Sequence, residues 1–195
     1  MPFLILRLRH QIQVIINKVS NIIDFTDVHL PKIRELGIPI MGVIPYDKEL
    51  PCLSVNYLAD RLFAKVIAGE AHMNRTIRKI FIGSMSASTA LKSPFFQEEN
   101  KVVITSGDRG DMIVAALESS TAAIVLTNNL LPSPNLIAQA DKANIPLLLV
   151  SLDTYEVAKQ IDNMESLPTK DDLDKLDRIE QMIRAHLNLD AFRHD

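Results

Sequence analysis

The stretch VVITSGDRGD, residues 102–111, decides the fold of this chain, because it joins the end of a strand to the start of a helix. Residues 102–105 are apolar and β-branched, which is typical of a strand that is covered on both faces. Residues 112–117 continue with helical character. Residues 107–111 therefore lie where a strand ends and a helix begins, and backbone N–H groups there favour negative charge. This junction predicts an anion site.

The side chains of the junction support two interpretations. Arg109 can bind a phosphate or carboxylate through paired N–H groups, while Gly107 and Gly110 let the backbone approach a ligand closely. In the structural interpretation, Asp108 is the N-cap of the helix, and Asp111 completes a pair similar to a capping box. Arg109 is then a solvated residue of the first helical turn. The sequence leaves both interpretations open.

The second half of the chain alternates strands with helices around this junction. Strands are predicted over residues 79–82, 102–105, 122–126 and 147–150, and helices over residues 87–91, 111–119, 135–143 and 155–161. Short connections in such an alternation predict an α/β fold of three layers, with a parallel sheet between two layers of helices. The loops after parallel strands meet at one edge of the sheet, where ligands bind in open α/β folds.

The loops expected at this edge carry hydroxyl, amide and acidic groups around one arginine. The predicted ligand-binding residues are Ser84, Ser86, Gly107, Asp108, Arg109, Thr127, Asn128, Asn129, Asp153 and Thr154. No His or Cys accompanies these hydroxyls to activate a nucleophile, so the set predicts binding rather than catalysis. The acidic residues are expected to cap helices rather than to bind Mg²⁺, and no metal site is predicted. The expected ligand is a nucleotide or another small anion.

Several of these segments together resemble a known family. They are the GDR sequence at residues 107–109, the strand ending in Thr127, and the IPLLLV sequence at residues 145–150 followed by Asp153 and Thr154. Residues 79–164 resemble the DRTGG domain on these segments. Where that family usually continues with two glycines, this chain has Asn128 and Asn129, which tolerate left-handed backbone and add two amide side chains. The resemblance implies a regulatory or accessory domain, of the kind attached to phosphotransacetylases, pyrophosphatases and P-loop proteins similar to dethiobiotin synthetase.

Residues 1–70 resemble the carboxyl-terminal half of the dethiobiotin synthetase-like P-loop fold. Residues 12–16 are predicted as a strand ending at Asn17, and a second predicted strand ends at Pro45. In that fold these two positions lie around the nucleotide base, so the resemblance implies a base contact. A satisfied strand-end residue is the other interpretation of Asn17. The chain contains no G-x-x-x-x-G-K-[ST] motif, so we expect no ATP hydrolysis.

Three further features concern the organisation of the chain. Helices are predicted over residues 26–36 and 55–68, and the polar residues 70–78 are the expected domain boundary. Residues 169–190 are predicted to form an amphipathic helix that opens with a capping box. The sequence leaves open whether this helix packs on its own domain or on a second chain. Half of a P-loop fold leaves apolar surface uncovered, which predicts a homodimer.

Composition excludes several classes of protein. The net charge of −3, the scattered basic residues and the absence of Trp give no case for a nucleic-acid partner. The single cysteine excludes a disulfide within the chain. The apolar run near the amino terminus is too short for a signal peptide or a spanning helix, so we expect a cytoplasmic location and no membrane partner.

These observations predict a non-catalytic regulatory or ligand-sensing module, which binds a nucleotide or small anion and pairs with itself. The alternative is a fragment or accessory part of an enzyme related to phosphotransacetylase or to ATP-dependent dethiobiotin synthetase. A third interpretation is an assembly module that joins chains through a sheet edge or the terminal helix. A separate partner enzyme is compatible with the first interpretation and the third.

Overall fold

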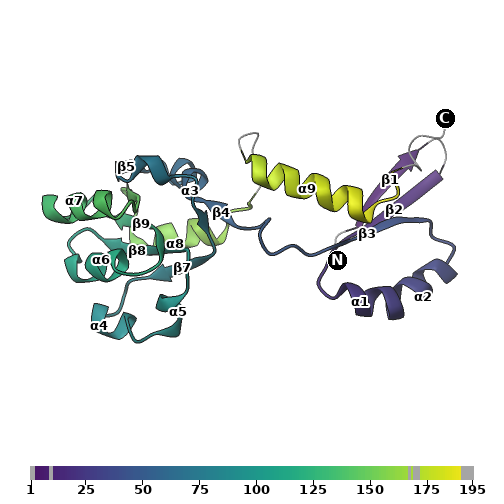
Figure 1. Ribbon diagram of the computed structural model, residues 1–195, viewed down its shortest axis with the longest axis horizontal. Coiled ribbons are helices and arrows are strands. Elements are labelled where there is room, and N and C mark those ends of the chain that lie inside the picture. Colours follow the sequence, from purple (N-terminus) through teal and green to yellow (C-terminus); the bar gives the residue numbers. More distant parts are fainter. Residues whose placement is uncertain (1–2, 9–10, 167, 169–171, 190–195) are drawn as a thin grey trace. The chain divides into compact units, whose positions relative to one another are not determined.

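The computed structural model describes residues 3–8, 11–166, 168 and 172–189, which form two compact units (Figure 1). The first unit comprises the described residues of Met1–Pro51 and Leu167–Asp195, and the second comprises Cys52–Ser166. The division falls after Pro51, whereas the sequence suggested residues 70–78. The reason lies in the second unit, where residues 55–68 contribute a helix and a strand to the core.

The sheet of the first unit has the strand order β1-β2-β3. Its strands are β1 (Phe3–Leu8), β2 (Gln11–Val19) and β3 (Ile40–Pro45). Strand β1 pairs antiparallel with β2, and β2 pairs parallel with β3. The crossover between the parallel strands contains α1 (Ile22–Asp24), a π-helical turn over Phe25–His29, and α2 (Leu30–Glu35). Residues Ile16, Val19, Phe25 and Leu30 form the small core beneath this crossover.

Helix α9 (Leu173–His186) belongs to the first unit and contacts β3. Its carboxyl end lies so close to the strand that a Cβ atom on Gly42 would clash with the carbonyl oxygen of His186. The side chain of Arg178 donates to Asp47, in the loop after β3, at 2.6 Å. The helix therefore packs on its own chain. The start of the predicted helix and its capping box, at residues 169–171, lie outside the described residues, as does residue 190.

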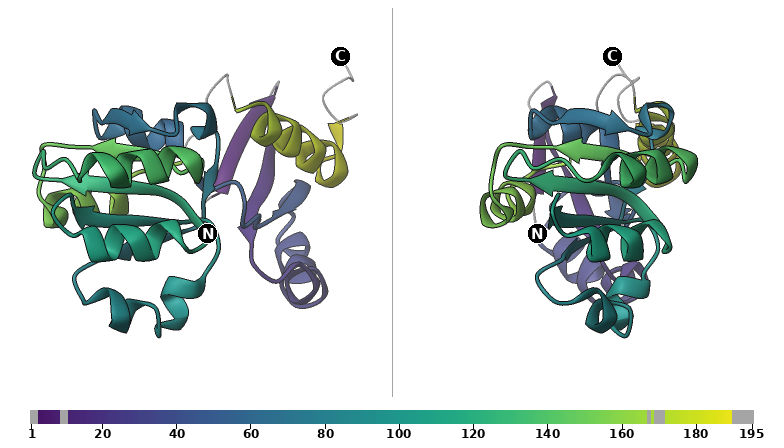
Figure 2. Two further views of the ribbon diagram at one scale, coloured as in Figure 1. Left: turned by 60° about the vertical axis from the view of Figure 1, so that its left-hand side comes forward. Right: turned by 90° about the vertical axis from the view of Figure 1, so that its left-hand side faces the viewer.

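A five-stranded sheet forms the centre of the second unit, in the order β5-β10-β9-β8-β7 (Figure 2). Its strands are β5 (Lys65–Ala68), β7 (Lys79–Ile82), β8 (Lys101–Ser106), β9 (Thr121–Thr127) and β10 (Leu147–Leu149). Strands β7 to β10 are parallel, which confirms the predicted α/β fold. Strand β5 pairs antiparallel with β10 at one edge.

Strand β5 was predicted to be the end of a helix. Helix α3 (Val55–Arg61) instead stops early, and Phe63 adopts a left-handed φ of 51°. This backbone conformation cannot continue a helix. Residues 65–68 then pair with β10, so backbone hydrogen bonds across the sheet outweigh the local helical pattern.

Helices cover both faces of this sheet. One face carries α4 (Ala87–Ala90), α5 (Pro94–Gln97), α6 (Gly110–Leu117) and α7 (Pro134–Lys142). The other face carries α3 and α8 (Thr154–Asp162). Alternate residues of each strand enter the two cores, so that Val103 faces the first layer and Val102 the second. Two short strands, β4 (Leu53–Ser54) and β6 (Thr76–Ile77), pair with each other beside α3, and a 3-10 turn spans Glu70–His72.

Candidate ligand-binding site

The loops after the parallel strands meet at the carboxyl edge of the five-stranded sheet, and Arg109 joins two of them. Its Nη1 atom donates to the carbonyl oxygen of Gly83 at 3.3 Å, and its Nη2 atom donates to that of Met85 at 2.8 Å. Its Nε atom donates to the carboxylate of Asp111 at 3.3 Å. A guanidinium carries five N–H donors. Arg109 is therefore a bridge between the ends of β7 and β8, as well as a candidate anion ligand.

Asp111 extends this bridge toward α4. Its carboxylate accepts from Arg109 and from the backbone N–H of Ala87, the latter at 3.5 Å. The hydrogen bond from Arg109 lowers the pKa of Asp111 below its usual value, despite a smaller opposing effect of burial. The guanidinium of Arg109, which the sequence predicted to bind an anion, thus already contacts the carboxylate of Asp111.

The capping interpretation of Asp108 is wrong. Helix α6 begins at Gly110, its N-cap position is Arg109, and no side chain caps it. Asp108 is exposed and lies one residue too early to reach that position. The capping-box-like pair with Asp111 therefore does not form, because the bridge made by Arg109 uses the Asp111 carboxylate.

Gly107 is required by a close approach of two loops. A Cβ atom at this position would clash with the carbonyl oxygen of Leu130. Gly110 differs, because a Cβ atom there would make an ordinary contact of 3.5 Å with Leu136. Gly107 thus brings the loop after β8 against the loop after β9, and no larger residue fits.

The turn formed by Thr127, Asn128 and Asn129 has left-handed backbone, with φ of 60° at Asn128 and 53° at Asn129. Both asparagines take the conformation that glycines adopt easily, as the sequence predicted. Their backbone N–H groups donate to Leu152 and Val150 at 2.9 and 2.8 Å. The turn is therefore fixed to the segment after β10.

Hydroxyl groups add a second link between these loops. The Oγ1 atoms of Thr127 and Thr154 lie 3.2 Å apart, and Asn128 Nδ2 donates to Thr127 Oγ1 at 3.4 Å. Thr127 is buried, whereas Asn128 and Asn129 are exposed. The amide side chains are thus the parts of this turn that face solvent.

Two predicted site residues cap helices. Ser86 Oγ accepts from the backbone N–H of Thr89 at 3.3 Å at the start of α4. Asp153 forms a complete capping box with Glu156, whose bonds measure 2.8 and 3.2 Å. The remaining serine, Ser84, is exposed and donates its backbone N–H to Ile82. Ser86 and Asp153 therefore stabilise the helix starts that frame the edge.

The chemistry of this edge is that of binding. Within the described part of the chain, no group of three or more His, Cys, Asp or Glu side chains is arranged to hold a metal ion. The Oγ1 atom of Thr105, the last residue but one of β8, is buried without a hydrogen-bond partner. Hydroxyls, amides, one guanidinium and helix amino ends together can hold a small polar ligand.

In the first unit, Asn17 and Pro45 lie at the ends of neighbouring parallel strands. Val19 pairs with Pro45, and Tyr46 donates its N–H to the carbonyl of Val19 at 2.9 Å. The Oδ1 atom of Asn17 accepts from the backbone N–H of Lys18 at 2.8 Å. This bond stabilises the left-handed φ of 59° at Lys18. These two strand ends are therefore neighbours, and the Asn17 side chain makes a local hydrogen bond within its own strand.

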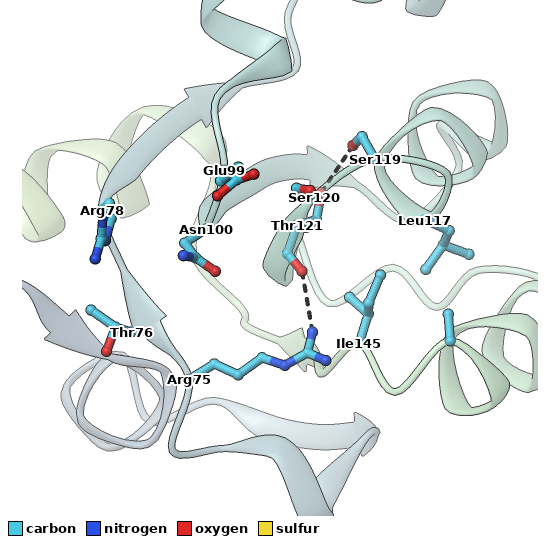
Figure 3. Close-up of a pocket in the computed structure, with 11 residues that line it drawn as sticks. Arg75, Thr76, Arg78, Glu99, Asn100, Leu117, Ser119, Ser120, Thr121 and Ile145 are labelled. Carbon is cyan, nitrogen blue, oxygen red and sulfur yellow. Dashed lines mark hydrogen bonds between the residues drawn. The ribbon is translucent and has the colours of Figure 1, made fainter.

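A pocket of about 670 Å³ lies at the opposite, amino edge of the five-stranded sheet (Figure 3). Its polar lining includes Arg75, Arg78 and Asn100, with the hydroxyl residues 119–121. This pocket was not predicted from the sequence, where the polar residues 70–78 were interpreted as a domain boundary. The two arginines in that stretch, three residues apart, were the available signal.

Comparison with known proteins identifies the second unit most clearly. The sequence profile of the DRTGG domain matches residues 57–164. Phosphate acetyltransferase of Pseudomonas putida is 28% identical over 90% of this chain, and that of Synechocystis sp. is 30% identical over 64%. The chain covers 27% and 19% of those two proteins, so it spans about a quarter of their length or less.

A solved structure shares the fold. It contains the CBS and DRTGG domains of the regulatory region of Clostridium perfringens pyrophosphatase, complexed with the activator diadenosine tetraphosphate. The TM-score is 0.51 at 17% identity, and the match covers 87% of this chain and 84% of that one. This likeness concerns the fold alone.

Proposed function

Because the chain belongs to the DRTGG domain family, we propose that it is a regulatory module that senses a nucleotide or another small anion and catalyses no reaction itself. The site proposed for this ligand is the carboxyl edge of the five-stranded sheet. Its ligand-binding residues are Ser84, Ser86, Gly107, Asp108, Arg109, Thr127, Asn128, Asn129, Asp153 and Thr154.

The observation that carries the proposal is the bridge made by Arg109. Its guanidinium holds the carbonyls of Gly83 and Met85 and the carboxylate of Asp111. An incoming phosphate forms stronger, charge-assisted bonds with a guanidinium than neutral carbonyls do. Ligand binding at Arg109 therefore competes with the hydrogen bonds from Arg109 to the loop after β7. This competition gives the module a way to convert binding into a change of loop position.

Support for a nucleotide as the ligand comes from a relative with the same fold. The regulatory region of the Clostridium perfringens pyrophosphatase binds diadenosine tetraphosphate as its activator. The carboxyl edge described here offers amides that can pair with a base and hydroxyls that can bind a ribose or phosphate. We therefore expect a nucleotide rather than a simple inorganic anion.

The proposed partner is an enzyme of acetyl or phosphoryl transfer. The curated relatives are phosphate acetyltransferases that are much longer than this chain. A regulatory role beside such an enzyme fits a chain that matches only part of it.

The alternative function is that of an accessory part of a phosphotransacetylase-related enzyme, and the same similarity favours it. The relation of residues 1–70 to a dethiobiotin synthetase-like P-loop fold stays a prediction, as does the base contact at Asn17 and Pro45.

Location and assembly are part of the same proposal. Among the helices of the described residues, none combines the length and apolar character needed to cross a membrane. A cytoplasmic homodimer suits a sensor of soluble metabolites. Exposed aromatic side chains on the second unit support self-association, since Phe63 and Tyr155, which are 95% and 71% exposed, line the same hollow. Light scattering at tens of micromolar, a concentration suited to weak pairs, measures the mass of the assembly.

Calorimetric titration with ATP, ADP and AMP, together with an ATP hydrolysis assay, tests the proposal. We expect binding of at least one nucleotide and no hydrolysis above that of a sample purified in parallel from cells lacking the gene. The Arg109→Ala variant should bind that nucleotide more weakly than the wild type does. Hydrolysis that survives repurification contradicts the non-catalytic assignment, and unaltered affinity in Arg109→Ala removes the proposed site.

A further inference from the structure

The pocket at the amino edge of the five-stranded sheet has two chemically different walls (Figure 3). Arg78 and Asn100 lie on one side and Leu117 and Ile145 on the other, while the side chain of Arg75 runs across toward Ile145. Ala143, two residues before Ile145 in the chain, adds a third apolar side chain to the lining. A cavity of about 670 Å³ falls within the range of roughly 300–1,000 Å³ that is typical of small-molecule sites.

The sheet topology explains why these residues meet. Arg78 directly precedes β7, Asn100 directly precedes β8, and Thr121 is the first residue of β9. In a parallel sheet the starts of neighbouring strands lie side by side. The backbone fixes the corner further, since the N–H of Arg78 donates to the carbonyl of Asn100 at 2.9 Å. Asn100 itself adopts a left-handed φ of 56°, a conformation that asparagine tolerates better than most other residues with a side chain.

Helix α6 ends at this edge, and its last carbonyl groups disfavour an anion in the pocket. Two nearby carbonyl oxygens accept hydrogen bonds from cationic side chains. Arg75 Nη1 donates to the carbonyl of Thr121 at 3.3 Å, and Lys101 Nζ donates to that of Ser120 at 3.3 Å. These bonds place the cations of Arg75 and Lys101 next to carbonyl oxygens that would otherwise oppose an anion.

Lys101 lies beside this pocket, inside the protein. Its side chain is fully buried, its Nζ atom lies 4.8 Å from the centre of the Phe96 ring, and it also donates to the carbonyl of Glu98 at 3.4 Å. Burial lowers the pKa of Lys101, because the charged form loses hydration. Arg75, Arg78 and Glu99 thus line the pocket, and Lys101 lies next to it, so that basic side chains outnumber the acidic one.

We propose that this pocket is a second ligand site, which binds a phosphomonoester with a flat, weakly polar body, such as a nucleoside monophosphate. The phosphate contacts Arg75 and Arg78, since guanidinium groups form paired bonds with phosphate oxygens. The body of the ligand packs on Leu117, Ala143 and Ile145. The carboxamide of Asn100 and the hydroxyl of Ser120 supply hydrogen bonds that orient it. This site is independent of the one proposed at the carboxyl edge.

The test is a calorimetric titration of the full chain with AMP, with adenosine and inorganic phosphate as the two partial ligands. We expect AMP to bind more tightly than either part, because only AMP uses both walls. The variant Arg78→Gln should weaken AMP binding about tenfold, as expected for the loss of one charged hydrogen bond. Arg75→Gln should act in the same direction.

Two controls make the result specific. Arg61→Gln removes an exposed arginine that stands over the Tyr57 ring and outside this pocket, and it should leave AMP affinity unchanged. Amide chemical shifts of the wild type provide a measurement that needs no variant. AMP should perturb the amides of Asn100, Ser119 and Ser120. Absence of AMP binding, equal affinity in Arg78→Gln, or shifts confined to residues 106–111 and 127–129 would each overturn the proposal.

Discussion

The Nη2 atom of Arg109 lies 2.8 Å from the carbonyl oxygen of Met85, and this bond joins the loop after β8 to the loop after β7. Through this bond and those to Gly83 and Asp111, one side chain connects four parts of the edge: two loops, the start of α4 and the start of α6. Arg109 therefore has a measurable role in stability as well as in the proposed binding.

Replacing Arg109 with Ala should lower the free energy of unfolding by about 1–3 kcal/mol, because two carbonyls and one carboxylate each lose a hydrogen-bond donor. It should also weaken anion binding by roughly 1.5–3 kcal/mol, the usual range for a charged hydrogen bond. Urea denaturation and calorimetry measure the two effects separately. Arg109→Lys serves as the control, since it keeps the charge but not the geometry of the bridge. A destabilised variant with full affinity would make Arg109 purely structural.

Gly107 and Gly110 form a matched pair for testing the close approach of two loops. Gly107→Ala should destabilise the protein by about 2 kcal/mol or more, because the new methyl group overlaps the carbonyl oxygen of Leu130. Gly110→Ala should change stability by less than about 1 kcal/mol, since its methyl group finds ordinary contact with Leu136. Thermal melts of both variants measure this contrast. Equal melting temperatures would show that the loops separate easily.

Much of this edge follows from sequence, and the parts that do not have identifiable causes. The alternation of apolar segments identified β7 to β10, and the left-handed asparagines at residues 128–129 were expected from their chemistry. Strand β5 was missed because residues 65–68 carry a helical pattern locally, whereas pairing with β10 is a long-range interaction.

The side-chain partners within the candidate site were harder to anticipate. Sequence spacing suggested that Asp111 serves a cap at Asp108, but the carboxylate turns to Arg109 and to Ala87, which lies 24 residues away in the chain. The pocket near Arg75 and Arg78 likewise requires three strand starts to come together. Such contacts depend on the completed sheet, and local patterns do not contain them.

The capping box at α8 gives a prediction about helix stability. Asp153→Ala should cost about 1 kcal/mol, because the backbone N–H of Glu156 loses its acceptor at the helix start. Asp153→Ser should recover most of this loss, since a serine hydroxyl caps nearly as well. Chemical denaturation of the two variants beside the wild type provides the measurement. A loss of similar size in both variants would indicate that Asp153 acts through its charge instead.

The pair formed by Asp47 and Arg178 predicts a pH dependence in the first unit. Burial alone would raise the pKa of Asp47, but hydrogen bonds from Arg178 and from the N–H groups of Glu49 and Leu50 hold it below its usual value. A carboxyl group with a lowered pKa in the folded state binds its proton more readily when unfolded. Its stabilising effect is therefore complete above the unfolded pKa of about 3.9 and disappears as the pH falls through the folded value.

The variant Arg178→Gln measures this effect. It should be less stable than the wild type near neutral pH, and the difference should shrink as the pH is lowered toward about 3. Arg184→Gln is the matched control, because Arg184 pairs with Glu180 on the exposed face of the same helix. Its loss should be small at every pH. A stability difference for Arg178→Gln that stays constant with pH would contradict the assigned role of Asp47.

We propose that the carboxyl edge of the five-stranded sheet binds a nucleotide. Amide chemical shifts recorded during a titration with ATP or ADP test it most directly, because they report the location of binding as well as its strength. We expect perturbed amides at residues 83–87, 106–111, 127–129 and 153–154, with smaller changes at the amino edge. Shifts confined to the amino edge, or no shifts at millimolar nucleotide, the range of weak binding, would contradict it.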